Sequence, residues 1–410
     1  MIIEKRIVGL AGIAVVAACA GGCQSTPKNE RDAILEYRTG NFAAAEQKLV
    51  GPAEKTNENY VLNNYRLGSA SLAAGDLTTA ETAFLRAYKV INSGDTNDPG
   101  RSLSATVLWE GAKVFKGEPF ERAMAHYYLG MIYLIKHDYN NARAAFQNSN
   151  FQVREYAKKD DLKDYKAVQS RFALGYFGLG FCYMRTGRQD LAQQNFQLAV
   201  DCDPQMQQLV QDVQQPGVNT LIFVDYGGGP QKSPKGWYNE ESVFGPTPAE
   251  VGPVPPVNAT VDGRPITGQH NYSTVDTLAL AQERSWQDID TVRKVKAAIG
   301  TGAMAAGTGL AIYGATSGKE AYTWAGLGAL AAGAALAASS QADLRYWEIL
   351  PRSVYIIPAV LPSGAHEIHV QAGNAGSAPL QLTVAATPPG VVDDHILYFR
   401  IGATGAVVHH

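Results

Sequence analysis

The sequence predicts an α+β fold, with α-helical repeats first and then a small β-sandwich interrupted by a Gly/Ala-rich helical hairpin. Three observations predict it. Small and aromatic residues recur at fixed spacings before residue 215, short runs rich in β-branched and aromatic residues follow Pro216, and two uncharged Ala/Gly stretches divide those runs. We expect a helical repeat domain over residues 28–215 and a C-terminal β module over residues 216–410, with the hairpin inserted at residues 280–345.

The clearest repeat unit begins at Tyr176 and ends at Pro204. It places Gly180 and Ala192 where two antiparallel helices cross, with Phe196 beside them and Pro204 where the second helix must stop. This is the tetratricopeptide spacing. Two further units, earlier in the chain, have the same spacing, and a weaker one runs from Ala33 to Leu49. The residues expected to pack the repeats are Gly68, Ala80, Phe84, Gly130, Tyr133, Ala142, Phe146, Gly180, Tyr183, Ala192, Phe196 and Pro204.

The first-helix positions that line the inner, concave side of such repeats are apolar in this chain. The candidate partner-binding residues on that side are Met124, Tyr127, Met131, Phe177, Phe181, Met184 and Arg185. A soluble protein seldom leaves so large an apolar patch uncovered. Two alternatives follow: a segment of the chain itself fills this face, or an apolar helix of a partner protein does.

Residues 297–318 and 321–342 carry no charge, and Lys319-Glu320 separates them. Small residues recur there at four-residue spacing: Ala325, Ala329, Gly333 and Ala337. This spacing predicts two helices in very close contact. Each arm is long enough to span a bilayer, but alanine and glycine gain little free energy on transfer into lipid. We therefore keep two alternatives, a hairpin packed by its own domain or by copies of itself, and a hairpin inserted in a membrane.

The β module is predicted from five short runs separated by turn residues. The runs are residues 219–226, 353–360, 366–371, 380–386 and 395–401. A Gly-Gly-Gly-Pro sequence ends the first run, and Pro/Gly turns separate the others. Short strands with such turns suggest a small antiparallel sandwich. We expect the first run to join the sheet of the later ones.

The N-terminus resembles a bacterial lipoprotein signal peptide. Lys5-Arg6 precedes an apolar run over residues 7–18, which is short for a transmembrane helix. The following Val16-Ala17-Ala18-Cys19 fits the lipobox, the motif whose cysteine receives a diacylglyceryl group, and Cys23 fits it less closely. We expect a signal peptide within residues 1–22, cleaved before Cys19 or Cys23, with lipid on that cysteine. An ordinary secretory signal peptide is the alternative.

Tests for chemistry at recognisable spacings are negative. The formal net charge of −3 and the lack of a basic block argue against nucleic acid as a partner. Residues 314–319 miss the phosphate-loop spacing by one residue. His366 and His369 fall in a predicted strand, where they point to opposite faces and cannot share a zinc ion. Cys182 and Cys202 are too far apart along their repeat for a disulfide. We expect no catalytic residue, no metal and no cofactor.

Two specific segments carry a family resemblance. They are Gly-Glu-Pro-Phe-Glu-Arg over residues 117–122, followed by His126-Tyr127-Tyr128-Leu129-Gly130, and Ala-Asp-x-Arg-x-Trp-x-x-Leu-Pro over residues 342–351. With them the chain resembles an uncharacterised bacterial family of tetratricopeptide-repeat lipoproteins. The resemblance implies an envelope lipoprotein that associates with other envelope proteins, and it supplies no catalytic residue. From the residues themselves, Asp343 and Arg345 would brace the hairpin exit against the sheet.

These observations favour a lipid-anchored scaffold or adaptor on the periplasmic side of the cell envelope, at the outer membrane. It would bind envelope proteins through its repeats without bond-making chemistry. One alternative is a self-assembling, membrane-active lipoprotein that uses the hairpin at residues 297–342, which would make a homo-oligomer. A third is an envelope enzyme of unknown type.

Overall fold

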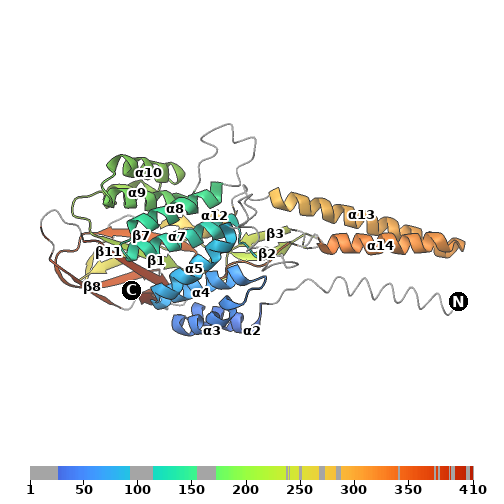
Figure 1. Cartoon of the computed structure of the whole chain (residues 1–410), viewed down its shortest axis with the longest axis horizontal. Coiled ribbons are helices and arrows are strands. Elements are labelled where there is room, and N and C mark those ends of the chain that lie inside the picture. The colour runs from blue at the N-terminus through green and yellow to red at the C-terminus, as the bar shows by residue number, and fades with distance from the viewer. Residues whose placement is uncertain are drawn as a thin grey trace. The chain divides into compact units, whose positions relative to one another are not determined.

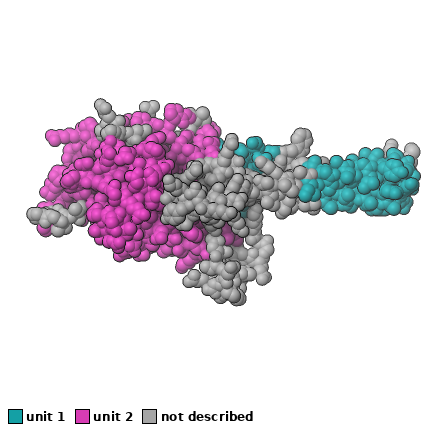
Figure 2. Space-filling view, turned by 90° about the horizontal axis from the view of Figure 1, so that it is seen from above, with its two compact units in different colours: residues 1–26, 232–245, 284–345 teal, residues 27–231, 246–283, 346–410 magenta. Residues whose placement is uncertain are grey.

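The computed structural model describes residues 26–92, 114–154, 172–236, 239, 241–248, 252–266, 273–282, 288–339, 342–373, 375–376, 379–386, 388, 393–402 and 407–409. They belong to two compact units, coloured separately in Figure 2. The hairpin unit includes residues 232–245 and 284–345. The repeat–sheet unit comprises residues 27–231, 246–283 and 346–410. The predicted domain boundary after residue 215 therefore does not coincide with a boundary between units, because strands from the C-terminal half pack with the repeats.

The N-terminal half folds into antiparallel helix pairs (Figure 1). The helices are α2 (Lys28–Arg38), α3 (Phe42–Glu54), α4 (Tyr60–Ala74), α5 (Leu77–Asn92), α7 (Pro119–Ile135), α8 (Tyr139–Arg154), α9 (Ala173–Arg185), α10 (Gln189–Cys202) and α11 (Met206–Val213). Local chemistry sets their ends. Gly75 stops α4 in the left-handed conformation, with a φ of 89°. Asp76 then caps α5 by accepting hydrogen bonds from the backbone N–H groups of Thr78 and Thr79, at 3.1 and 2.9 Å.

One glycine–phenylalanine contact recurs in three helix pairs. A Cβ atom at Gly180 would lie only 2.5 Å from the ring of Phe196, so the backbone of α9 approaches α10 as closely as that ring allows. The same contact joins Gly68 to Phe84 at 2.8 Å and Gly130 to Phe146 at 2.7 Å. The alanines predicted beside these contacts, Ala80, Ala142 and Ala192, are buried. Tyr133 and Tyr183 are half-buried, and Pro204 follows the end of α10 on the surface.

The C-terminal half supplies two sheets to the repeat–sheet unit. The first has the strand order β12-β11-β1-β7-β6, and the second has β10-β8-β4-β5 with β9 beside β8. The first sheet contains β1 (Thr220–Tyr226), β6 (Ser273–Asp276), β7 (Ser353–Ala359), β11 (His395–Ile401) and β12 (Val407–His409). The second contains β4 (Val257–Val261), β5 (Arg264–Pro265), β8 (Gly364–Ala372), β9 (Ala375–Gly376) and β10 (Leu380–Val384). The short helix α12 (Thr277–Gln282) follows β6.

The strand at residues 220–226 does join the sheet of the later strands, as expected, but the expectation of antiparallel pairing throughout was wrong. β1 pairs antiparallel with β7 and parallel with β11. A parallel neighbour requires a long crossover connection, which the chain between β1 and β11 provides. β1, β7 and β11 are buried along almost their whole length, as strands covered on both faces are. The packing of the two sheets as a sandwich stays a prediction.

The hairpin unit consists of α13 (Asp288–Ser317) and α14 (Glu320–Ser339), together with β2 (Gln231–Lys235) and β3 (Glu241–Gly245). Glycines form the seam between the helices. A Cβ atom at Gly326 would lie 2.3 Å from the backbone nitrogen of Ala311, and one at Gly314 would lie 2.3 Å from that of Thr323. The predicted hairpin is therefore confirmed, and its seam follows the predicted residues in part, because Gly333 is buried whereas Ala325 is exposed. Among the described helices, none is both long enough and apolar enough to cross a membrane.

Candidate partner-binding face of the repeats

The residues predicted to meet a partner lie inside the repeat–sheet unit. Those almost completely buried are Met124, Tyr127, Met131, Phe177 and Phe181. Met184 and Arg185, at the end of α9, are half-buried. A partner cannot reach the buried side chains in this fold. The prediction that they bind a partner therefore gives way to the other alternative, in which the chain fills its own inner face.

The first sheet covers much of this face. The ring of Tyr127 on α7 lies 6.5 Å from the ring of Phe223 on β1, centre to centre. The neighbouring Tyr128 donates a hydrogen bond from its hydroxyl to Asp225 on β1, at 2.6 Å. Burial of this apolar area against a sheet is the main stabilising term that joins the two halves of the chain.

The guanidinium of Arg185 is hydrogen-bonded to other residues of the repeat–sheet unit. Its guanidinium donates to both carboxylate oxygens of Asp394, each at 2.8 Å, and to the carbonyl of Val218, also at 2.8 Å. Asp394 is almost fully buried and also accepts a hydrogen bond from the hydroxyl of Tyr139. Since Asp394 immediately precedes β11, these contacts attach the start of that strand to the last two helix pairs.

The segment after the hairpin fills another part of the inner face. We call residues 346–351 the strap. The indole of Trp347 is 1% exposed and stacks on the ring of Tyr65 at 4.5 Å, with the rings of Phe84 and Tyr128 each 5.9 Å away. These rings place Trp347 among α4, α5 and α7. Asp343 and Arg345 pair with each other inside the hairpin unit.

Polar contacts fix the strap on both sides of the indole. The backbone N–H of Trp347 donates to the carboxylate of Glu121 at 2.6 Å, and the same carboxylate accepts from the backbone N–H of Glu118 at the start of α7. Glu348 receives two hydrogen bonds from the guanidinium of Arg66, one of them from Nε at 2.9 Å. We call the set Tyr65, Arg66, Phe84, Glu121 and Tyr128 the Trp347 seat.

A buried polar network lies beside the seat. Asp225 on β1 is buried and accepts hydrogen bonds from the hydroxyls of Tyr128 and Tyr398, at 2.6 and 2.9 Å. Arg400 on β11 donates to the hydroxyl of Tyr37 on α2, at 3.0 Å. Burial raises the pKa of Asp225 to about 6, although nearby Arg400 and the two hydroxyls favour the ionised form. The network ties α2 and α7 to β1 and β11.

The described histidines are engaged within the fold. Within the described ranges there is no cluster of three His, Cys, Asp or Glu side chains that could hold a metal ion. His126 is buried, and burial together with Arg122 lowers its pKa to about 3, so it is neutral. On β8, His366 is buried and bonded to Asp262 at 2.8 Å, while His369 is on the opposite face and bonded to Glu367. The prediction that the two histidines face apart is confirmed.

The remaining sequence motifs have structural roles or lie outside the described residues. Gly314 of the failed phosphate-loop motif packs in the hairpin seam. Gly229 of the Gly-rich turn donates from its backbone N–H to the carbonyl of Leu350 at 2.7 Å. The proposed lipid-attachment residues Cys19 and Cys23 fall outside the described residues.

Sequence reasoning missed the residues that hold the halves together. Asp225 and Arg400 each interrupt an apolar strand run, and Arg66 lies in a helix whose neighbours are mostly buried. A charged residue in a run of buried positions indicates a buried ion pair or hydrogen-bond network. That signal was present in the sequence, but it does not say which residues pair.

Comparisons with known proteins agree with the repeats. Residues 173–206 match the family described as tetratricopeptide repeat. Solved structures titled "Crystal structure of MamA protein" and "Crystal structure of MamA" are similar at 16% identity each. The first match covers 50% of this chain and 89% of that chain with a TM-score of 0.28; the second covers 45% and 99% with a TM-score of 0.22. No curated protein matches the chain.

Proposed function

We propose that this chain is a lipid-anchored cell-envelope scaffold that binds partner proteins through its helical repeats. The observation that carries the proposal is the repeated helix pair, in which one glycine–phenylalanine contact recurs and the last pair matches the tetratricopeptide repeat. Stacked repeats form extended surfaces suited to binding proteins. The basic start, the apolar run and Cys19 or Cys23 support a lipid anchor at the outer membrane, on the periplasmic side.

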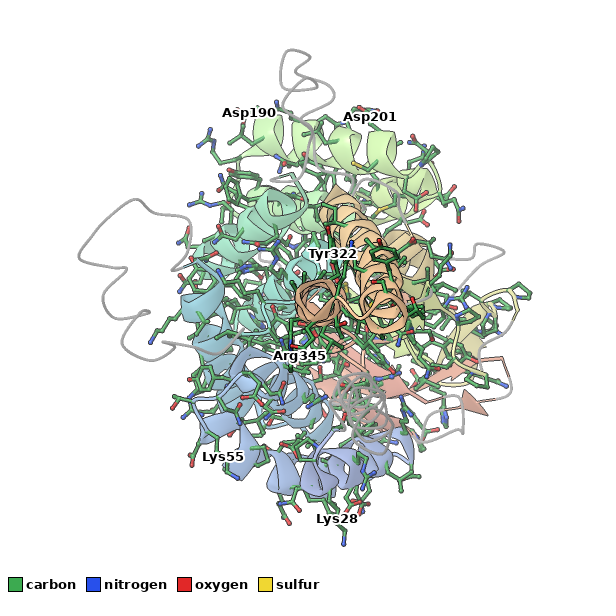
Figure 3. The ribbon with its side chains drawn as sticks, turned by 90° about the vertical axis from the view of Figure 1, so that its right-hand side faces the viewer. Lys28, Lys55, Asp190, Asp201, Tyr322 and Arg345 are labelled. Carbon is green, nitrogen blue, oxygen red and sulfur yellow. The ribbon has the colours of Figure 1, made fainter. Side chains whose placement is uncertain are left out.

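Because the inner face is filled, we infer that partners use the outer face of the last helix pair. Polar side chains of α10 are exposed along its length: Gln189, Asp190, Gln193, Gln194, Gln197 and Asp201. Figure 3 shows Asp190 and Asp201 at the outer edge of the repeats, pointing away from them. Amide and carboxylate groups on one rigid helix suit a partner that presents hydrogen-bond donors and positive charge.

Site-specific photo-crosslinking in intact cells tests the outer-face proposal. A photoreactive residue at Gln193 or Gln197 should capture a recurring envelope protein, and the same residue at Lys55, exposed at the other end of the repeats, should not. Asp190→Lys with Asp201→Lys should reduce the capture. Equal capture at all three positions, or none at α10, would contradict the proposal.

Palmitate labelling tests the anchor separately. Cys19→Ser or Cys23→Ser should abolish the label, and the other substitution should leave it in place. Labelling that survives in the double variant would rule out Cys19 and Cys23 as the lipid-attachment residues while leaving the scaffold function standing.

A specific observation favours self-assembly through the hairpin as a second candidate function. Large apolar side chains are exposed on it, among them Trp324 at 66% and Ile312 at 59%. Between residues 297 and 342 the only charged residues are Lys319 and Glu320. Two helices with such long uncharged, apolar stretches are candidates for burial against other copies or at a lipid surface.

Sedimentation of the chain without its anchor tests this candidate. The unsubstituted chain should sediment as an oligomer or together with liposomes, and Ile312→Glu with Trp324→Glu should abolish both. Leu35→Glu is the matched control, since Leu35 is 63% exposed but lies on α2. A chain that sediments as a monomer and does not sediment with liposomes would refute the second candidate.

A further inference from the structure

The strap contacts the repeats as a bound peptide contacts a receptor. Residues 342–348 belong to no helix or strand, so no ladder of backbone hydrogen bonds holds this part of the chain in place. Trp347 and Glu348 are held by an aromatic stack, by a two-bond ion pair, and by hydrogen bonds from the Trp347 N–H to Glu121 and from Arg38 to the Glu348 carbonyl. The residues that make these contacts lie more than 200 positions earlier in the chain.

The Trp347 seat has a defined chemical preference. Tyr65, Phe84 and Tyr128 surround an indole on several sides, which suits a large aromatic ring. Arg66 is 2% exposed and presents Nε and one terminal nitrogen to a carboxylate, with Asn63 accepting from its other terminal nitrogen at 2.8 Å. This two-pronged geometry fits a carboxylate better than a neutral group. The Glu121 carboxylate accepts from the backbone N–H of the aromatic residue, and the segment then turns, with the backbone N–H of Leu350 donating to the carbonyl of Trp347 at 3.5 Å.

One polar group of the seat and one of the strap lack a hydrogen-bond partner in this contact. The hydroxyl of Tyr65 and the indole nitrogen of Trp347 are both buried, and neither has a hydrogen-bond partner among the described residues. Buried donors without acceptors weaken a complex, so a peptide that supplies an acceptor here would bind more tightly than the strap does. The resident segment is therefore an incomplete match to its own site.

We propose that the Trp347 seat is a peptide-binding site for a short segment in which an aromatic residue is followed directly by an acidic one, and that the strap is its resident occupant. A partner segment of this chemistry binds when the strap leaves. The strap begins where the chain leaves the hairpin unit, at residues 345 and 346, so its release would change the connection to that unit. This site is distinct from the outer face of α10.

Peptide binding to the full-length chain tests the inference. The probe is a fluorescent nine-residue peptide with the sequence of residues 344–352. Trp347→Ala with Glu348→Gln empties the seat and should give saturable binding by fluorescence anisotropy, at least about tenfold tighter than binding to the unsubstituted chain, whose seat is occupied. Adding Arg66→Met should weaken that binding by about tenfold or more, because the two-bond contact to the carboxylate is lost.

Two control peptides define specificity, one with the tryptophan replaced by alanine and one with the glutamate replaced by lysine. Both should bind about tenfold more weakly or not at all. If the double variant does not fold by circular dichroism, Glu348→Gln alone takes its place and should still bind the probe more tightly than the unsubstituted chain.

Absence of probe binding to a folded variant, or equal binding of the control peptides, would overturn the inference. Neither result would bear on crosslinking at α10, so failure of this inference and failure of the scaffold proposal are separable.

Discussion

Adding a single methyl group at Gly180 tests the repeat packing directly. In Gly180→Ala the new Cβ atom would lie 2.5, 2.7 and 2.9 Å from three ring atoms of Phe196, which is fully buried. Overpacking of this kind costs about 1–3 kcal/mol. Alanine in a helix recovers about 1 kcal/mol relative to glycine. Because the whole ring must move, we expect a net loss of about 1–2 kcal/mol in the free energy of unfolding.

Gly51→Ala is the matched control. Gly51 also lies inside a helix of the repeats, α3, but its added Cβ atom would meet nothing within 4 Å. The helix-propensity gain is offset in part because Gly51 precedes Pro52, and a residue with a Cβ atom is disfavoured in the helical conformation there, so Gly51→Ala should change the free energy of unfolding by less than about 1 kcal/mol. The two substitutions, chemically identical, should therefore differ by about 1–2 kcal/mol.

Urea unfolding followed by far-ultraviolet circular dichroism measures both variants, and the midpoint should fall further for Gly180→Ala than for Gly51→Ala. A double-mutant cycle with Phe196→Leu isolates the contact, since the cost of Gly180→Ala should shrink when the ring is absent. If Gly180→Ala proved as stable as Gly51→Ala, the close contact between α9 and α10 would be refuted.

Three further predictions concern buried contacts between elements of the fold. Arg185→Ala leaves the buried carboxylate of Asp394 without its cation and should lower the free energy of unfolding by about 3 kcal/mol, measured by urea unfolding; a loss below 1 kcal/mol would contradict the pairing. Because the pKa of Asp225 is raised from 3.8 to about 6 in the folded state, its contribution favours folding below pH 4 and is lost as the pH rises through 6. Thermal unfolding from pH 4 to 7 should show a fall of about 2 kcal/mol relative to Asp225→Asn, and parallel pH profiles would be the contrary result. Gly326→Ala places a Cβ atom 2.3 Å from the backbone of α13 and should reduce helicity by circular dichroism, whereas Gly328→Ala, with nothing within 4 Å, should not.

The arrangement of the two halves explains why the repeats do not offer an open inner face. Tetratricopeptide-like helices leave an apolar inner surface that must be covered. Here β1 and the strap cover it, and Arg185 and Asp225 fix the cover with buried polar contacts. A repeat domain built in this way leaves polar side chains of α10 exposed and carries a peptide-like segment within its own structure.

The sequence was informative where a feature depends on neighbours along the chain. The spacing of Gly180 and Phe196 predicted a helix pair, and the uncharged stretches around Lys319-Glu320 predicted the hairpin. The alternation in β8 placed His366 and His369 on opposite faces. These features follow from backbone periodicity and turn chemistry, which act over a few residues.

Only the tertiary structure decided which distant segments meet. Nothing local indicates that Trp347 stacks on Tyr65, that β1 runs parallel to β11, or which face of α14 forms the seam. Many apolar and charged residues could satisfy the same local pattern, and the choice among them depends on packing that buries the most apolar area while pairing every buried charge. The sequence by itself therefore determined the elements of this protein, and long-range packing determined that the repeats close upon their own sheet and strap.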